Sequence, residues 1–257
     1  MPRASFRAAV VFVALAAGPA AAADPVAHPF LATGGETFIT DAAGKAVWTF
    51  PQSSRDGWVL ENGNVLLALS KGKAYPGGAV VEVDRAGKVV AEVPLQAQTK
   101  DHHLQTRMTR KLPNGNYLVP QLLDRVVREY DPAGKVVWQV KTPHMPFTAI
   151  RLADGNTLVG CTLGNLVIEV DKDGKEVWRL TNDDLPGKPI NDACGVQRLA
   201  NGNTVVTSHH ATAGQVKLTE VTRDKKVVWT YTDDRKGGIH HFQVLDAAGK
   251  PGKDPLR

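Results

Sequence analysis

The stretch DKDGKEVWRL at residues 171–180 determines the fold, because close copies of it recur along the chain. The other copies are DAAGKAVWTF from Asp41, DRAGKVVAEV from Asp84, DPAGKVVWQV from Asp131 and TRDKKVVWTY from Thr222. A second element recurs between them: LENGN from Leu60, LPNGN from Leu112, LADGN from Leu152 and LANGN from Leu199. Recurrence at intervals of roughly 40 to 50 residues indicates a repeat architecture.

Each repeat reads as four short strands. Asn-Gly or Asp-Gly between apolar runs predicts a hairpin, for which we expect a type I′ turn with positive φ at both central residues. A strand follows that turn, a loop and a third strand come next, and the D-x-x-G turn leads into a fourth strand. Four-stranded units at this period predict a β-propeller, since one unit cannot bury both of its faces alone.

One repeat is divided between the two ends of the chain. The N-terminal region supplies the strands PFLATG, ETFITD and KAVWTF, but no inner strand precedes them. The missing inner strand is HHFQVLDAAGK at residues 240–250. We therefore predict an all-β, five-bladed propeller of four-stranded antiparallel blades, in which the C-terminal strand pairs with the N-terminal strands and closes the ring.

Tryptophans recur at one position of the outermost strand, as Trp48, Trp138, Trp178 and Trp229, with Ala91 in the remaining repeat. An outer strand lies far from the central channel, so these indoles are poorly placed to stack on a ligand there. We predict that they pack between neighbouring blades.

The first 23 residues differ from the rest in composition. Arg3 and Arg7 precede the apolar run at residues 8–17, and a stretch of alanines ends at Ala23 with an A-x-A pattern. These features predict a secretory signal peptide over residues 1–23, too short to span a bilayer. We expect a single β-propeller domain over residues 24–257, without a membrane span, that is periplasmic or secreted.

The composition is that of a soluble globular protein, with 42% apolar and 22% charged residues. The formal net charge of +5 becomes +3 when Arg3 and Arg7 are removed. Many lysines fall in the expected hairpin turns, so we expect no nucleic-acid partner, and we expect a monomer. The two cysteines, Cys161 and Cys194, allow a disulfide in an oxidising compartment but do not require one.

The phrase V-D-x-D-G-K-E-V-W resembles the repeat of quinoprotein-type propellers, which carry pyrroloquinoline quinone repeats. The element L-x-N-G-N-x-L-V is similar to repeats of arylsulfotransferase-like propellers. The resemblance covers nearly all of residues 24–257 and implies, as an alternative function, an enzyme of quinoprotein or sulfotransferase type. Quinoprotein dehydrogenases of that superfamily are longer and have a vicinal cysteine pair that this chain lacks. We therefore do not expect pyrroloquinoline quinone as a cofactor.

One face of the predicted ring collects the reactive side chains. Inner and third strands begin on this face and second and outer strands end there, whereas the tight hairpins lie on the opposite face. Aligning the inner-strand leucines places five residues at equivalent positions near the channel mouth: Arg55, Arg107, Phe147, Cys194 and His240. Most of the histidines belong to the same rim: His102, His103, His144, His209, His210, His240 and His241.

Three interpretations of this rim remain open. In the first, Arg55, Arg107, Cys194 and His240 bind a small ligand, with the arginines favouring an anion. In the second, His103, His209 and His241 bind zinc or copper, supported by Asp101 or Asp192. Adjacent side chains of a strand point to opposite faces, so each pair of neighbouring histidines can direct only one imidazole inward. In the third, the histidines only join neighbouring blades through hydrogen bonds.

Catalytic residues are not specified by the sequence. Asp56, Asp101 and Asp192 are candidate carboxylates for hydrolysis, and Ser208 beside His209 is a candidate dyad. Gly-rich phosphate loops, paired C-x-x-C motifs and H-E-x-x-H motifs do not occur. The sequence therefore predicts an exported propeller that binds a small ligand or a protein partner at the rim, and leaves open whether it is an enzyme.

Overall fold

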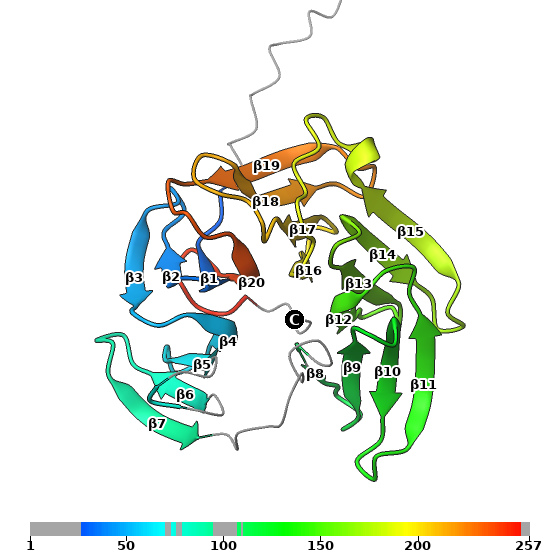
Figure 1. Ribbon diagram of the computed structural model, residues 1–257, viewed down its shortest axis with the longest axis horizontal. Coiled ribbons are helices and arrows are strands. Elements are labelled where there is room, and N and C mark those ends of the chain that lie inside the picture. The colour runs from blue at the N-terminus through cyan, green and yellow to red at the C-terminus, as the bar shows by residue number, and fades with distance from the viewer. Residues whose placement is uncertain (1–26, 70–72, 76–78, 95–106, 109, 253–257) are drawn as a thin grey trace, which may run out of the picture.

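The computed structural model describes residues 27–69, 73–75, 79–94, 107–108 and 110–252. These residues form five four-stranded antiparallel sheets, arranged as blades around a central axis (Figure 1). The all-β, five-bladed propeller is therefore confirmed. Within this part of the chain, no helix is long and apolar enough to cross a membrane. The predicted signal peptide lies outside the described residues.

Four blades are each built from one continuous segment, running from the inner to the outer strand. Blade two comprises β4 (Ser54–Val59), β5 (Val65–Leu69), β6 (Ala79–Val83) and β7 (Val89–Pro94). Blade three comprises β8 (Arg110–Lys111), β9 (Tyr117–Gln121), β10 (Val126–Tyr130) and β11 (Val136–Lys141). Blade four comprises β12 (Pro146–Arg151), β13 (Thr157–Cys161), β14 (Leu166–Val170) and β15 (Glu176–Thr181), followed by the short 3₁₀ helix η2 (Asn182–Asp184). Blade five comprises β16 (Val196–Arg198), β17 (Thr204–Thr207), β18 (Val216–Val221) and β19 (Val227–Thr232).

Blade one combines the two ends of the chain, as predicted. Its strands are β20 (Ile239–Val244), β1 (Phe30–Gly34), β2 (Thr37–Thr40) and β3 (Ala46–Phe50), in that order from the inside. Two buried glutamines fix β20 to the neighbouring blades: the Gln243 side chain accepts a hydrogen bond from the Val59 amide (2.7 Å), and Gln197 accepts one from the Val244 amide (3.0 Å). The closing strand is therefore bonded to blades one, two and five.

The hydrophobic core lies between the blades. Five clusters of buried apolar side chains are found among the described residues, and each of the four larger ones draws on two neighbouring blades. The tryptophans take part as predicted: the indole of Trp138 in blade three donates to the Lys172 carbonyl of blade four (2.8 Å), and that of Trp178 in blade four donates to the Arg223 carbonyl of blade five (2.9 Å).

The hairpins between inner and second strands are not the type I′ turns that we predicted. At Leu60–Asn64, the Gly63 amide donates to the Leu60 carbonyl and the Leu60 amide to the Asn64 carbonyl. Only Gly63 of these residues has positive φ, at 88°. This is a type I turn followed by a left-handed glycine, the alternative that a longer loop favours.

The last asparagine of each L-x-x-G-N element has a role that sequence reasoning missed. Its side chain donates to a glutamate of the third strand, in the pairs Asn64–Glu82, Asn116–Glu129, Asn156–Glu169 and Asn203–Glu220. Three of these glutamates also contact a cationic or imidazole group of the next blade, in the pairs Glu129–Arg151, Glu169–Arg198 and Glu220–His28. The repeated Asn and Glu therefore join hairpins to strands and blades to one another.

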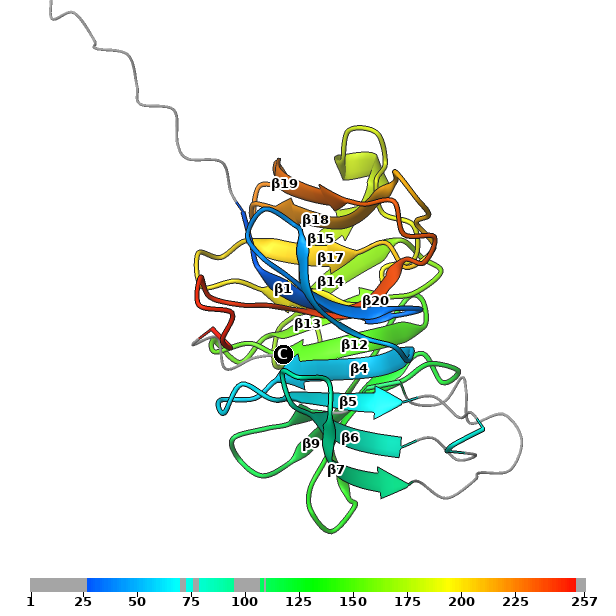
Figure 2. The same cartoon turned by 90° about the vertical axis from the view of Figure 1, so that its left-hand side faces the viewer.

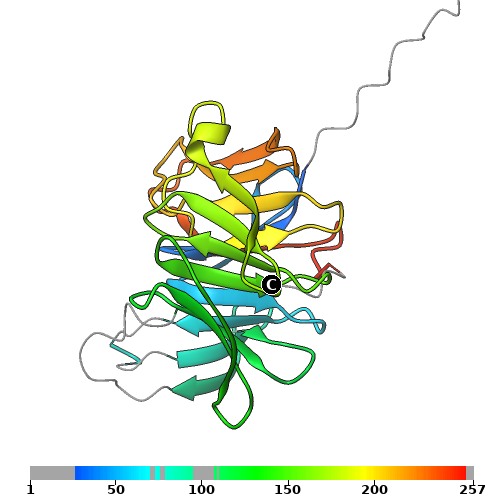
Figure 3. The same cartoon turned by 90° about the vertical axis from the view of Figure 1, so that its right-hand side faces the viewer.

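The two faces of the ring differ in their loops. Viewed edge-on, the second and outer strands of blade two, β5 and β7, end on the same side of the ring (Figure 2). The described connections between blades and the described loops between second and third strands lie on this side, and the short hairpins lie on the other (Figure 3). We call the first side the connector face.

Ring closure makes a first prediction. Deleting the chain from Gly237 onward removes β20 and leaves the β1 and blade-two surfaces uncovered, so we expect the shortened protein to lose its single cooperative thermal transition. A matched deletion of residues 253–257 keeps β20 and should melt like the full chain. Circular dichroism and calorimetry of both variants measure this, and an unchanged melting curve after the larger deletion would show that closure by β20 is not required.

Candidate functional site

A β-bulge occurs at the start of the inner strand in three blades. In each, the backbone pairing skips one residue, between Ser54 and Asp56, between Pro146 and Thr148, and between Ile239 and His241. The skipped residues are Arg55, Phe147 and His240, which the sequence alignment placed at equivalent positions. Bulges re-aim side chains and are common beside functional sites. These three side chains are therefore directed differently from their strand neighbours.

Phe147 is at the centre of this group, although it was not predicted to be a site residue. Its ring centroid lies 5.0 Å from that of His240 and 5.2 Å from that of His241. The Arg107 guanidinium lies over the same ring, 5.5 Å from its centroid. The structure thus brings together side chains from before blade three and from the inner strands of blades one and four.

His209 joins the cluster from blade five. It lies in the turn that follows β17, and its ring meets that of His240 edge-on, with centroids 3.9 Å apart. Gly238 allows this approach, since a Cβ there would lie 1.9 Å from the His209 carbonyl oxygen. A side chain at Gly238 would therefore displace His209 from His240.

A cavity of about 250 Å³ opens beside the two imidazoles. Ser54 and Arg55 of blade two line it, together with residues of blades one and five and of the connection between blades one and two. The lining residues are Gly34, Gly35, Ser53, Ser54, Arg55, His209 and His240. Two of the four predicted ligand-binding residues, Arg55 and His240, line this cavity.

The histidines of the cluster are held neutral. Burial lowers the pKa of His209 and that of His241 to about 4, and the pKa of His240 falls further because burial is reinforced by His209, His241 and both arginines around it. Among the described residues, His209 Nδ1, His240 Nδ1 and His241 Nε2 are buried and have no hydrogen-bond partner. Buried polar atoms normally have partners, so these three ring nitrogens are unsatisfied positions inside the cluster.

The arginines are the charged groups of the cluster. Burial lowers the pKa of Arg55, and burial together with the nearby Arg55 charge lowers that of Arg107. Both remain cationic at neutral pH, because guanidinium groups are not deprotonated in proteins. The charge of Arg55 acts against that of Arg107, and the charge of Asp192 partly offsets this effect on Arg107.

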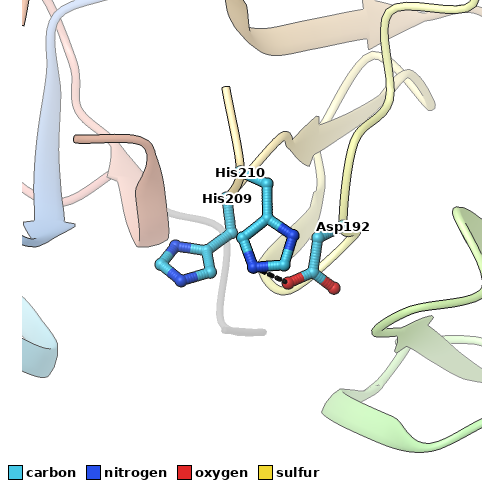
Figure 4. A group of neighbouring side chains, drawn as sticks. All are labelled: Asp192, His209 and His210. Carbon is cyan, nitrogen blue, oxygen red and sulfur yellow. Dashed lines mark ion pairs between the residues drawn. The ribbon is translucent and has the colours of Figure 1, made fainter. Parts of the chain in front are cut away.

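Asp192 provides negative charge at the edge of the cluster. Its Oδ1 accepts hydrogen bonds from the Thr162 hydroxyl and from the Leu163 amide (2.8 Å). Its Oδ2 faces the His210 ring, with 3.5 Å between Oδ2 and Nε2 (Figure 4). The carboxylate is therefore fixed from blade four and directed toward a histidine of blade five.

The remaining predicted residues lie in several places. Cys194 is buried below the rim, where its thiol lies 3.6 Å from Asp192 Oδ2 and burial raises its pKa. Cys161 is also buried, and both thiols are free, so the disulfide that the cysteine count allowed is not formed. His103 lies outside the described residues, together with His102 and Asp101.

The metal set His103, His209 and His241 therefore stays a prediction. Within the described ranges, the histidine and carboxylate group that could hold an ion is Asp192, His209 and His210, and it does not include His241. We reasoned that adjacent histidines point to opposite faces, but His209 and His210 lie in a turn, where this alternation does not apply. Their ring centroids are 5.2 Å apart.

Two of the hydrolytic candidates, Asp56 and Ser208, are occupied by structural contacts. Asp56 is buried and pairs with Arg110 at 2.9 Å. The Ser208 hydroxyl donates to the Pro189 carbonyl (2.7 Å) and accepts from the Asn191 amide (3.2 Å), so the suggested Ser208–His209 dyad is wrong. These contacts hold the connection between blades four and five.

Comparison with known proteins agrees with the repeat assignment. Residues 123–247, slightly less than half of the chain, match the family model for outer membrane protein assembly factor BamB. The chain is thus a β-propeller of repeats similar to pyrroloquinoline quinone repeats, while the likeness to arylsulfotransferase propellers stays a prediction. No curated protein matches the chain.

Similar solved structures share the fold at low sequence identity. A protein of unknown function from Bacteroides caccae aligns with a TM-score of 0.55 and 23% identity, covering 86% of this chain and 85% of that one. Virginiamycin B lyase from Staphylococcus aureus aligns with a TM-score of 0.40 and 10% identity, covering 80% and 70%. The likeness to the Bacteroides caccae protein supports the fold alone, and the likeness to the lyase is too weak to support any conclusion about this chain.

The neutral histidines make a second prediction, that stability falls as the pH falls from about 6.5 to about 4. Histidines of the unfolded chain protonate near pH 6.5, whereas the folded protein holds the pKa of His209 and His241 at about 4. The unfolded state therefore binds more protons in this interval. A fully buried imidazole such as His241 lowers the free energy of unfolding by up to about 1.4 kcal/mol per pH unit.

Urea unfolding at pH 7, 6 and 5 measures this slope. His241→Gln removes one of the titrating groups and should reduce the slope, while His144→Gln changes an exposed histidine of the connector face and should not. A free energy of unfolding that stays constant from pH 7 to pH 5 would contradict the neutral, buried state of the cluster.

Proposed function

We propose that the protein is an exported β-propeller that binds a small anionic molecule at the mouth of its central channel. The observation that carries the proposal is the convergence of Arg55, Arg107, His209 and His240 from different parts of the ring. Arg55, His209 and His240 line one cavity. Arg107 lies over the Phe147 ring, which itself contacts His240.

The charges of the channel mouth favour an anion. Two guanidinium groups lie close enough for Arg55 to lower the pKa of Arg107, after the larger effect of burial. Among the described carboxylates near the cluster, Asp56 pairs with Arg110, and the oxygens of Asp192 are engaged by Thr162, Leu163, Cys194 and His210. An anion placed between the arginines would reduce their mutual repulsion and accept charge-assisted hydrogen bonds from both.

The size and lining of the cavity favour a small ligand over a macromolecule. Pockets for drug-sized ligands measure roughly 300–1,000 Å³, and this cavity measures about 250 Å³. Its lining includes Gly34, Gly35 and Ser53 beside Arg55, while the hydroxyl of the lining residue Ser54 is bonded to that of Thr37 (2.6 Å). Sulfate, phosphate or a short carboxylate matches both this volume and these polar groups.

Anion binding is the third prediction. We expect sulfate or phosphate to bind to the purified protein, and Arg55→Gln and Arg107→Gln each to weaken binding about tenfold or more, since a hydrogen bond to a charged group contributes about 1.5–3 kcal/mol. Isothermal titration calorimetry measures the affinity, and thermal melting of each variant shows whether it remains folded.

Lys135→Gln and Lys175→Gln provide matched controls, because they remove the same charge from the side of the ring opposite the connector face, where the short hairpins lie. They should leave anion affinity unchanged. Binding that depends on these lysines and not on the arginines would place the site on the wrong face of the ring and overturn the proposal.

Export is the fourth prediction, and the pattern of residues 1–23 supports it. Arg3, Arg7, the apolar run at 8–17 and the alanines at 21 and 23 match the parts of a secretory signal. When the protein is expressed in a Gram-negative bacterium, mass spectrometry of the periplasmic fraction should find a chain that begins at Asp24. Ala23→Arg should block this cleavage, and recovery of the intact chain from the cytoplasm alone would refute export.

A further inference from the structure

We infer that Asp192, His209 and His210 form a binding site for a divalent transition-metal ion of the Zn²⁺ type, next to the anion cavity. One carboxylate oxygen and one imidazole nitrogen from each histidine lie within 4.8 Å of one another. Figure 4 shows the His210 ring against the carboxylate, with the His209 ring on the other side of His210. This metal group shares His209 with the proposed anion site but does not depend on anion binding.

The separation of the donor atoms suits a metal after a small adjustment. Zinc lies about 2.0–2.2 Å from nitrogen and oxygen ligands, so the ligands of a tetrahedral ion are about 3.3 Å apart. The His210 ring and Asp192 Oδ2 are already 3.5 Å apart. The His210 side chain is 54% exposed and lies in a turn, so it can rotate without disturbing the core.

The backbone holds all three residues in one unit. The His209 amide donates to the Asp192 carbonyl (3.0 Å), and the His210 amide donates to the Asn191 carbonyl (3.1 Å). The Asp192 amide in turn donates to the Asn165 side chain (2.7 Å). The separation of carboxylate and imidazoles is therefore set by hydrogen bonds rather than by free loops.

The environment of Asp192 matches that of a metal ligand. Thr162 and Leu163 donate to Oδ1, which orients the carboxylate, and Oδ2 faces the Cys194 thiol and the His210 ring. Such supporting hydrogen bonds are typical around metal-binding carboxylates. Asp192 is also buried and has a φ of 71°, a backbone conformation that non-glycine residues rarely adopt and that clusters at functional sites.

His209 connects the metal group to the cavity. Among the residues that the structure describes, its Nδ1 is a buried nitrogen without a hydrogen-bond partner. Three protein ligands leave one position of a tetrahedral ion open, as in catalytic zinc sites. Since His209 also lines the cavity with Arg55 and His240, water or a small anion in the cavity could occupy that position.

The charges of the two sites should make the binding of a metal ion and of an anion strengthen each other. One carboxylate leaves a divalent ion with a net charge of +1, and Arg55 and Arg107 add to it. An anion that contacts both the ion and the arginines would balance this excess. We therefore expect the metal to increase anion affinity, although each can bind without the other.

Metal binding by the purified, tag-free protein is the fifth prediction. Titration with Zn²⁺ should show one equivalent bound, and Co²⁺ should give visible absorption bands typical of four or five coordination, while Mg²⁺ should not compete. His210→Ala and Asp192→Asn should each weaken Zn²⁺ binding at least about tenfold and abolish the Co²⁺ bands.

Two controls distinguish binding at this site from binding elsewhere on the protein. His144→Ala removes another exposed histidine of the connector face and should leave Zn²⁺ affinity unchanged. Arg55→Gln should weaken sulfate binding about tenfold or more and keep Zn²⁺ binding. His210→Ala without metal should keep sulfate binding, so either proposal can fail alone.

Because Asp192 also holds neighbouring loops, Asp192→Asn could unfold locally, and thermal melting checks this. His210 is largely exposed, so His210→Ala keeps the test decisive even if the Asp192 variant is unstable. Absence of Zn²⁺ and Co²⁺ binding in the native protein, or binding that His210→Ala does not change, would overturn the inference.

Discussion

The pairing of β1 with β20 is the contact on which the rest of the structure depends. It joins residues 30–34 to residues 239–244 and converts an open row of sheets into a ring. Because the closing strand is the innermost strand of its blade, the same pairing brings His240 and His241 to the channel mouth. It places them against Phe147 of blade four, and His240 against His209 of blade five. Closure therefore completes both the fold and the candidate site.

The two faces of the ring use the repeat differently. On the hairpin side, the same asparagine and glutamate recur and join each turn to its own blade. On the connector face, the bulges recur, but the skipped residue differs between blades: Arg55, Phe147 and His240. A repeated backbone irregularity thus presents a different side chain from each blade to one place. This arrangement allows a symmetrical scaffold to build an asymmetric site.

Burial determines the chemistry of that site. Three imidazoles that would titrate near neutral pH in water are kept neutral, because desolvation and two arginines disfavour their protonated forms. Neutral imidazoles retain a lone pair that can accept a hydrogen bond or bind a metal ion. The arginines supply positive charge for an anion, and Asp192 supplies the negative charge that a cation needs. The anion cavity and the metal group can therefore lie side by side.

The sequence by itself determined the architecture, since its repeats specify the number of blades, the divided blade and the inter-blade tryptophans through local turn chemistry and strand periodicity. It also placed Arg55, Phe147, Cys194 and His240 at equivalent positions, because that alignment depends only on spacing. Tertiary structure alone decided the rest. Loop conformation and hydrogen bonds between separate segments determined the type I turns and the contacts that occupy Ser208. They also determined the buried position of Cys194 and the approach of Asp192 to His209 and His210. Strand periodicity carries no information about such contacts, because the residues that make them lie outside the strands.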